Sequence, residues 1–357
     1  MAMDTPDERL LWARTQFSPS GAYLDTATAG LPPAAAWDAL RPTLADWRGG
    51  DADAVAYDRP VERSRSLFAD LVGTNRANVA VGPQTSVFVG LVAASLPEGA
   101  EVLTAEGDFT SVLFPFYTRG SSRLRVREVP LEQLAESVTR STYLVAVSAV
   151  QSSDGRVADL EALSVACAAT GTQVLLDATQ AAGWLPIEAG RFDYVVASGY
   201  KWLLAARGTA FLAVAPARVD DLRPIAAGWY AGADPWQSIY GSPLRLADDA
   251  KRFDVSPAWH SWVTQAPALE LLAHVGKHTL QTNAMALSRR FCDGVGVPFG
   301  GSAIVSLGID DEAPARLADA GVSGSMRAGR LRVSFHVSTS EDDVDRAVDA
   351  RAGHVAA

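Results

Sequence analysis

The chain has 357 residues, of which 48% are hydrophobic and 20% are charged, and its formal net charge is −10 at pH 7. This length allows two hydrophobic cores, and the composition is ordinary for a soluble globular protein without low-complexity tracts. The acidic balance disfavours a general binder of nucleic acid or of acidic membranes, because no basic run offsets it.

The two cysteines, Cys167 and Cys292, lie far apart and form no metal or redox motif. The N-terminal stretch MAMDTPDERLLWARTQF is acidic and lacks a long apolar core, so it predicts an amphipathic helix instead of a signal peptide. The longest apolar stretch, about residues 87–96, is too short to span a bilayer. We therefore expect a cytoplasmic protein without a metal site or a membrane segment.

Small residues crowd a turn near the N-terminus, in the stretch GAYLDTATAGLPP. A brief strand at Tyr23 leads into a turn over residues 25–33 that ends at paired prolines. Its alanines and Gly30 let a backbone approach a ligand closely. Local features leave open whether this turn binds a ligand or only leads into a domain. Apolar residues at helical spacing follow over residues 34–47 and 61–72.

Residues 78–96 predict a strand, a Gly-Pro turn and a largely apolar helix. The turn places Gln84, Thr85 and Ser86 in the first turn of that helix. Free backbone N–H groups and the positive end of the helix dipole make this a natural phosphate site. Alone the signal is weak, because Ser and Thr cap helices of every kind. The phosphate-site interpretation therefore needs support from polar residues at other strand ends.

The middle of the chain alternates strands with helices, which predicts a mostly parallel sheet covered on both faces. Residues 101–120 read as a strand and a loop, with Phe109 just past the strand end. The segments that follow are, in order, a strand at 123–130, a helix at 131–138, a strand at 143–150, a helix that starts near Asp159 and a strand at 173–177.

Two short apolar runs, VLLDA and YVVAS, have the character of buried parallel strands, and each ends in polar residues. Ligands of α/β proteins lie beyond the carboxyl ends of the strands, so Asp177 and Lys201 are expected to point into one cleft. A buried amine and a buried carboxylate need a partner. A pyridine cofactor meets that need, with Lys201 as its Schiff base and Asp177 paired with its ring nitrogen. The strand-end residues expected to converge here are Thr85, Phe109, Gln151, Asp177, Gln180, Ser198 and Lys201.

The pattern changes past Lys201. RGTAFLAVAP reads as a further strand, whereas residues 228–241 are rich in Gly and aromatic side chains and predict irregular structure and a change of domain. A long helix is expected from about residue 263 to residue 287 and beyond. The last part of the chain reads as strand, helix, strand and helix, which predicts a small α+β lobe.

The chain resembles the class V aminotransferase family of pyridoxal-phosphate (PLP) enzymes, which includes cysteine desulfurases, kynureninases and isopenicillin N epimerase. The resemblance runs from YLDTATAGLPP to RVSFHVSTSEDDVD, and its most specific motifs are DATQ and SGYKW. It implies an α/β protein of PLP-dependent fold type I, with a large domain on a mostly parallel seven-stranded sheet and a small α+β C-terminal domain. We expect an N-terminal helix in residues 1–20 that packs with the small domain, a large PLP-binding domain at 21–245 and the small domain at 246–357.

The resemblance also implies roles for individual residues. Lys201 matches the lysine that holds PLP as a Schiff base and then moves a proton, and Asp177 matches the carboxylate that faces the pyridine nitrogen. Gln180 matches a residue that hydrogen-bonds the phenolic oxygen of the cofactor. Phe109 matches the position that stacks on the cofactor ring.

The family match extends to the phosphate. Gln84 and Thr85 match the phosphate-binding turn, and Ser198 and Tyr200 match two further phosphate contacts. Cysteine desulfurases commonly carry His at the positions of Tyr200 and Phe109, whereas kynureninases carry Tyr and Phe. Both positions therefore favour the kynureninase side of the family.

Two residues match positions that act across a dimer. Trp229, in AGWYAG, resembles the kynureninase Gly-Trp loop that reaches the cofactor of the neighbouring subunit. Ser256, in DVSPAW, falls near a Thr or Asn that contacts phosphate across the dimer, offset by one residue in length. The resemblance therefore implies a homodimer with shared active sites and an amino-acid substrate.

Arg332, in LRVSFH, matches the arginine that grips the α-carboxylate of the substrate, a group that suits the fork of a guanidinium. Arg330 lies two residues away, and strand alternation puts both side chains on one face, so the local pattern does not choose between them. The family match selects Arg332. Substrate specificity is expected from Thr26, Phe109, Trp229 and the C-terminal lobe.

Cysteine desulfurases carry a nucleophilic Cys on a loop before the arginine strand, where this chain reads AGVSGSMRAG and has none. Persulfide-forming desulfuration is therefore not expected. The favoured expectation is a lyase that cleaves a C–S or C–C bond in the side chain of an amino acid through a PLP-stabilised carbanion. The alternatives are an aminotransferase or epimerase on the same scaffold, a catalytically silent binding or assembly protein, and a Schiff-base aldolase without PLP, which needs neither the phosphate turn nor Asp177.

Overall fold

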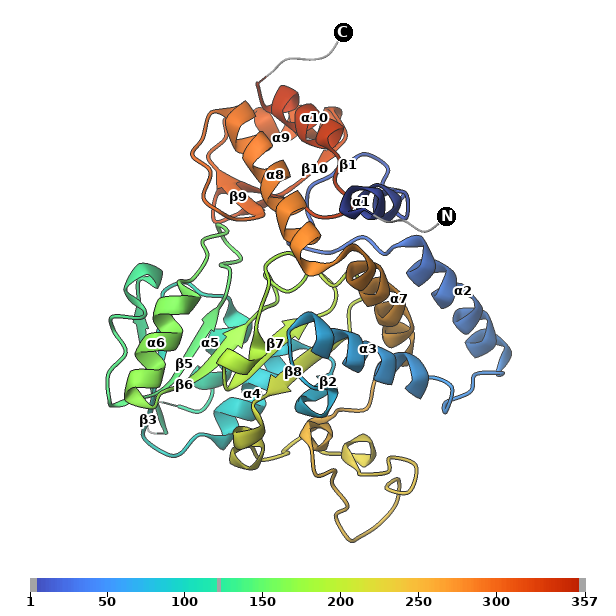
Figure 1. The fold of residues 1–357 in the computed structure, drawn as a ribbon, viewed down its shortest axis with the longest axis vertical. Helices are drawn as coiled ribbons and strands as arrows, with labels where there is room; N and C mark the ends of the chain where they lie inside the picture. The colour runs from blue at the N-terminus through green and yellow to red at the C-terminus, as the bar shows by residue number, and fades with distance from the viewer. Residues whose placement is uncertain (1–4, 121–122, 353–357) are drawn as a thin grey trace.

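A seven-stranded sheet forms the centre of the molecule, and the computed structural model describes residues 5–120 and 123–352 (Figure 1). The strands are β2 (Val79–Gly82), β3 (Ala100–Ala105), β4 (Leu124–Val129), β5 (Thr142–Ser148), β6 (Gln173–Asp177), β7 (Tyr194–Ser198) and β8 (Ala210–Val214). Across the sheet they lie in the order β2-β8-β7-β6-β5-β3-β4. Neighbouring strands are parallel except where β8 pairs with β2 and β7. The prediction of a mostly parallel, seven-stranded sheet is confirmed.

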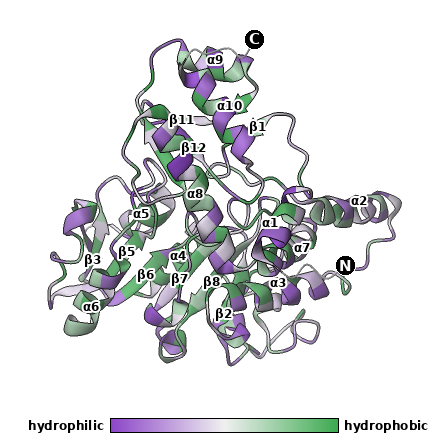
Figure 2. Cartoon of the chain, turned by 45° about the horizontal axis from the view of Figure 1, so that its top comes forward, coloured by the Kyte–Doolittle hydropathy of each residue, from purple (hydrophilic) through white to green (hydrophobic). Residues whose placement is uncertain are grey.

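Helices cover both faces of this sheet, because its strands alternate apolar side chains toward each side. The helices are α1 (Pro6–Arg14), α2 (Ala34–Gly49), α3 (Asp58–Leu71), α4 (Thr85–Ser95), α5 (Thr110–Tyr117), α6 (Leu160–Thr170), α7 (Trp259–Val275), α8 (Lys277–Val295), α9 (Ala313–Asp319) and α10 (Glu341–Ala352). One face packs on α3, α6 and α7, where the rings of Phe68 and Phe211 stack with centroids 4.2 Å apart. The other packs on α4 and α5 around Phe88 and Phe116. The central strands accordingly appear mostly hydrophobic in Figure 2.

A smaller lobe contains the C-terminal part of the chain and one N-terminal strand. Its strands are β9 (Ile304–Leu307), β11 (Ser325–Arg327) and β12 (Arg330–Ser334), which form an antiparallel sheet, and β1 (Ala22–Tyr23) and β10 (Val322–Ser323), which pair in parallel. Together with α8, α9 and α10 they enclose a separate core around Phe291 and Phe335. Helix α1 contacts α7 and α8. The domain limits given above stay a prediction.

Three expectations about individual elements are wrong. Residues 131–138 form only a 3-10 turn at Leu131–Gln133, because the segment is a short connection between β4 and β5. The long helix expected from residue 263 is two helices, α7 and α8, because Gly276 between them has a φ of 90° that no helix residue adopts. The loop expected after Phe109 begins with helix α5.

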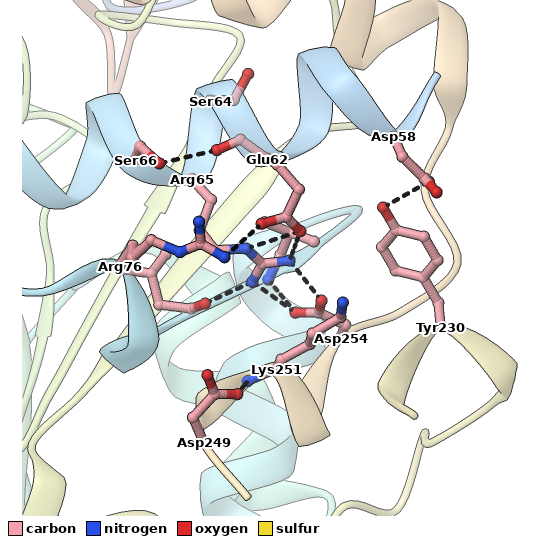
Figure 3. Close-up of polar contacts among 12 residues, drawn as sticks. Asp58, Glu62, Ser64, Arg65, Ser66, Arg76, Tyr230, Asp249, Lys251 and Asp254 are labelled. Carbon is pink, nitrogen blue, oxygen red and sulfur yellow. Dashed lines mark hydrogen bonds and ion pairs between the residues drawn. The ribbon is translucent and has the colours of Figure 1, made fainter. Parts of the chain in front are cut away.

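A buried ion pair ties three separate segments together beside the sheet (Figure 3). The guanidinium of Arg65, on α3, binds both carboxylate oxygens of Asp254 at 2.6 and 3.1 Å, and both side chains are excluded from solvent. Arg65 also donates to the carbonyl of Val79, while Asp254 accepts the backbone N–H of Val81. The pair therefore fixes strand β2, which leads to the first turn of α4, against the connection between the 3-10 turn Ala250–Phe253 and helix α7.

No helix in the described part of the sequence is long and apolar enough to cross a membrane. The same residues contain no group of three His, Cys, Asp or Glu side chains arranged to hold a metal ion.

Candidate active site

The carboxyl ends of the parallel strands open into a cavity of about 210 Å³. Its position follows from the sheet order, since β6 and β7 are neighbours and the strand ends of β2 and β5 lie on the same edge. The described residues that line it are Gln84, Thr85, Phe109, Thr110, Ser111, Ser148, Ser152, Asp177, Thr179, Gln180, Ser198, Tyr200, Lys201 and Arg207. Eight of these are among the residues predicted from sequence, and the structure brings them together in one place.

The first turn of α4 and three hydroxyl groups form one end of the cavity. The Thr85 hydroxyl lies 2.7 Å from that of Ser198 and 3.2 Å from that of Thr179. Thr179 also accepts the backbone N–H of Ser198. The side chain of Gln84, the residue that caps α4, makes no hydrogen bond to the helix end, so the first-turn N–H groups keep their capacity for an anion.

Asp177 ends β6 at the floor of the cavity and is only 4% exposed. It accepts the backbone N–H of Thr179 at 2.8 Å, which fixes the direction of the carboxylate. Burial raises the pKa of Asp177 to about 6, and the charge of Asp108 adds to that rise, while the bonds from Thr179 and the charge of Lys201 oppose it. A cation placed against this carboxylate would restore its ionised form.

Lys201 follows β7 and is 5% exposed. Burial lowers the pKa of its amine to about 8, and the guanidiniums of Arg332, Arg327 and Arg207 add to that fall against the opposing charge of Asp177. Its Nζ atom lies 5.2 Å from the ring centroid of Phe109 and 5.7 Å from that of Tyr200. The lysine is thus buried, desolvated and flanked by two aromatic faces.

Gln180 connects the cavity to Arg332 through Ser152. The Gln180 amide donates to the Ser152 hydroxyl at 3.0 Å and to the Ala27 carbonyl at 2.9 Å. Arg332 donates from one terminal nitrogen to the carbonyl and hydroxyl of Ser152, at 2.6 and 3.1 Å, and from the other to Thr28 at 2.7 Å. Burial lowers the pKa of Arg332 to about 10, and its Nε has no hydrogen-bond partner among the described residues.

The two arginines that sequence alternation could not separate lie in different environments. Arg332 is 1% exposed and faces Ser152. Arg330 begins β12 at the hairpin end, is exposed, and donates to the carbonyl and hydroxyl of Ser306. The two side chains share a face of the strand, but only Arg332 reaches the interior.

Five of the predicted residues do not line the cavity. Arg332 contacts it only through Ser152, and Gln151 is buried with its amide 3.5 Å from the carbonyl of Ser148. The other three lie apart from it. Thr26 is fully buried, and its hydroxyl has no partner within residues 5–120 and 123–352. Trp229 lies in a 3-10 turn, where its ring packs on those of Tyr230 and Trp236 with centroids 5.2 and 5.1 Å away. Ser256 is exposed. The roles proposed for these three residues stay predictions.

The turn after Lys201 is joined to the small lobe. The Nε2 of His336 donates to the carbonyl of Trp202 at 2.9 Å, while its Nδ1 accepts the backbone N–H of Val337. Burial lowers the pKa of His336 to about 4, so the ring is neutral. The Trp202 indole donates in turn to the side-chain oxygen of Gln180 at 2.8 Å. These contacts connect residues that follow β12 to the cavity wall.

Sequence reasoning missed several residues of the cavity wall. Asp108 accepts the backbone N–H and hydroxyl of Ser148 at 2.8 and 2.5 Å, which holds the end of β5 beside Asp177. Ser152 and Arg207 lie in irregular turns where no periodicity marks them. Their one sequence signal is position, since each follows a strand whose end reaches the cavity.

Residues 22–295 match the family model described as aminotransferase class-V. The protein belongs to this family. A Bacillus subtilis protein named as an uncharacterized aminotransferase, YcbU, is 32% identical over 60% of this chain and 59% of its own length. Kynureninase of Deinococcus radiodurans is 29% identical over 64% of this chain and 58% of its own length. The match therefore spans less than two thirds of the length of these two relatives.

The family comparison extends to solved structures. A cystine C-S lyase solved in complex with cysteine persulfide is similar in structure, with a TM-score of 0.83, 19% identity, and coverage of 93% of this chain and 97% of that one. The large sheet and small lobe are thus those of the PLP-dependent fold type I. The class V family is one of PLP-dependent enzymes, and the cofactor is pyridoxal 5′-phosphate.

The residues present fit this cofactor. Hydroxyl groups, free helix N–H groups and the Arg207 guanidinium are donors that suit a phosphate dianion. A buried carboxylate without a cationic hydrogen-bond partner suits a pyridinium nitrogen, and the desolvated amine of Lys201 suits the aldehyde carbon. Gln180 and Ser152 add polar atoms on the side that leads to Arg332.

Proposed function

We propose that this protein is a PLP-dependent lyase that cleaves a C–S or C–C bond in the side chain of an amino acid, as a cytoplasmic homodimer with shared active sites. The observation that carries the proposal is the placement of a desolvated amine and a buried carboxylate at adjacent strand ends, next to a hydroxyl-lined helix N-terminus. When bound, PLP draws electrons from the substrate Cα and so weakens the bonds around it.

Lys201 acts as nucleophile and as proton carrier in this proposal. With a pKa of about 8, roughly one tenth of the amine is neutral at pH 7, and this neutral form would serve as the nucleophile that holds PLP through its aldehyde carbon. With a substrate bound, the same Nζ atom would accept and return the Cα proton. The rings of Phe109 and Tyr200 flank this amine, with their centroids 5.2 and 5.7 Å from Nζ.

Asp177 would hold a proton on the pyridine nitrogen of bound PLP. Its carboxylate is buried and oriented by the N–H of Thr179, so a proton placed opposite it is stabilised in a low-dielectric setting. Two unit charges at about 4 Å interact by about 4 kcal/mol at an effective dielectric constant of 20. That energy corresponds to a change of about a thousandfold in reaction rate.

Arg332 orients the substrate. Its guanidinium is held by Ser152 and Thr28 on its terminal nitrogens, and a planar fork suits a carboxylate. By fixing the α-carboxylate, Arg332 would orient the bonds at Cα and so select the bond that is cleaved.

Two features favour lyase chemistry over persulfide formation. The aromatic residues at positions 109 and 200 match the kynureninase side of the family, and a kynureninase is among the relatives at 29% identity. The hairpin before Arg332 carries no cysteine, and Cys167 and Cys292 are both buried in helices. A lyase that acts through the Cα carbanion needs no cysteine nucleophile.

The test is purification followed by a substrate panel. The protein should be yellow, and Lys201→Ala should lose the cofactor absorbance of the covalent linkage while Lys277→Ala, at the surface, keeps it. Incubation with cysteine, cystine and kynurenine should release pyruvate, alanine or a sulfur fragment. Slow half-transamination with every amino acid of the panel contradicts the lyase proposal, and a colourless protein that ignores added PLP supports a silent binding protein.

A second candidate function is transamination on the same scaffold. It is favoured by the Bacillus subtilis relative, whose name is that of an aminotransferase and whose identity is 32%. Transfer of the amino group to an oxo acid at a rate above any cleavage supports this candidate. Incorporation of solvent deuterium at Cα without cleavage or transfer supports an epimerase instead.

A further inference from the structure

We infer that Arg207 supplies the positive charge that binds the phosphate group of the cofactor. The sequence pattern does not single out this residue, and it lines the cavity together with Gln84, Thr85, Ser198 and Tyr200. The inference rests on the cofactor of the family and not on the reaction proposed above.

The phosphate end of the cavity is otherwise neutral. The side chains of Thr85, Thr179 and Ser198 contribute hydroxyl groups, and the N-terminus of α4 contributes about half a unit of positive charge. A phosphate carries nearly two negative charges at pH 7, and an uncompensated charge in a buried site is costly. A full cation is therefore needed nearby.

Two cations are found among the described residues that line the cavity, Lys201 and Arg207. Lys201 would hold the aldehyde carbon of PLP, so its charge is not available to the phosphate. Burial raises the pKa of Tyr200, so its phenol stays neutral and adds no charge. Arg207 is thus the cation left for the phosphate.

The position of Arg207 is fixed by its backbone and by an aromatic face. Its carbonyl accepts the Ser261 hydroxyl at 2.7 Å, and Gly208 follows with a φ of 116°. The guanidinium carbon lies 4.8 Å from the ring centroid of Tyr200, a cation–π distance. Arg207 is exposed at the rim of the cavity, and its guanidinium forms no ion pair with any described residue, so its planar set of N–H donors remains available for phosphate oxygens.

Loss of this guanidinium should weaken the phosphate contact selectively. A hydrogen bond to a charged group contributes about 1.5–3 kcal/mol, which corresponds to a roughly tenfold to hundredfold change in dissociation constant. Arg207→Gln should raise the dissociation constant for PLP by that factor. The dissociation constant of Arg207→Lys for PLP should lie between those of the parent and of Arg207→Gln. Lysine keeps the positive charge but lacks the planar set of donors.

The experiment compares PLP with pyridoxal, which has the same ring and aldehyde but no phosphate. Apoprotein is titrated with each compound, and binding is followed by cofactor absorbance and by quenching of tryptophan fluorescence. Arg207→Gln should bind PLP tenfold to a hundredfold more weakly and bind pyridoxal as the parent does. Arg125→Gln, on the exposed side of edge strand β4, serves as the control and should bind both as the parent does.

Two outcomes overturn the inference. One is a PLP affinity for Arg207→Gln within twofold of the parent. The other is an equal loss of affinity for PLP and pyridoxal, because a residue that only shapes the cavity affects both compounds alike. Either result leaves the proposed lyase reaction untouched, whereas failure of the parent protein to bind PLP at all contradicts the proposed function and not the assignment of Arg207.

Discussion

The buried pair between Arg65 and Asp254 should contribute far more to stability than a surface pair on the same helix. In Asp254→Asn the amide can still accept the Val81 N–H, but the guanidinium of Arg65, 2% exposed, loses its bidentate partner. Breaking a buried pair on one side costs about 3–5 kcal/mol. Glu62 still contacts Arg65 at 3.0 Å, so we expect a loss of about 3 kcal/mol.

Urea unfolding followed by tryptophan fluorescence measures this loss. The matched control is Arg63→Gln, two residues along α3, whose ion pair with Glu270 is about half exposed on both sides. That pair should contribute less than about 1 kcal/mol. The double variant Arg65→Leu/Asp254→Leu should lose less free energy of unfolding than Asp254→Asn, because it leaves no charge buried. Equal losses for Asp254→Asn and Arg63→Gln would refute the reasoning.

Three further predictions concern the cavity. Arg332→Gln should raise the KM for the amino-acid substrate about tenfold or more in steady-state assays, whereas Arg330→Gln, which is exposed, should change it less than twofold. Thr85→Val should weaken PLP binding about fivefold in absorbance titrations while Ser95→Ala, at the other end of α4, leaves it unchanged. The rate at which apoprotein captures PLP should rise about tenfold per pH unit below pH 8 and level off above, because only the neutral amine of Lys201 reacts; a rate that keeps rising to pH 10 contradicts the lowered pKa.

The sequence was sufficient to predict the central sheet and the placement of Asp177 and Lys201 at the carboxyl ends of its strands. Strand residues buried on both sides leave continuous apolar runs, and the first polar residue after each run marks a carboxyl end. Parallel strands share that end, so Asp177, Lys201, Thr85 and Ser198 can be placed together from the sequence alone. The periodicity of the strands, and the rule that parallel strands end at the same edge of a sheet, are enough to place these four residues.

Residues held by long-range contacts could not be predicted in this way. Ser152 is 180 positions from the arginine it orients, and its turn has neither periodicity nor an unusual composition. Arg330 and Arg332 lie on the same face of β12. Only the packing of that strand against Leu24 and Ser152 buries Arg332 and leaves Arg330 exposed. The break at Gly276 was visible as a glycine, but apolar residues continue on both sides and conceal it.

The contact between His336 and the Trp202 carbonyl affects how the small lobe can move. A lid that swings from a distant hinge carries its residues through a wide arc, but here the backbone just after Lys201 is fastened to the segment that follows the strand of Arg332. We expect any rotation of the small lobe that keeps this hydrogen bond to have its axis beside Lys201. Arg332 would then travel only a short arc, and its spacing from the lysine would change little.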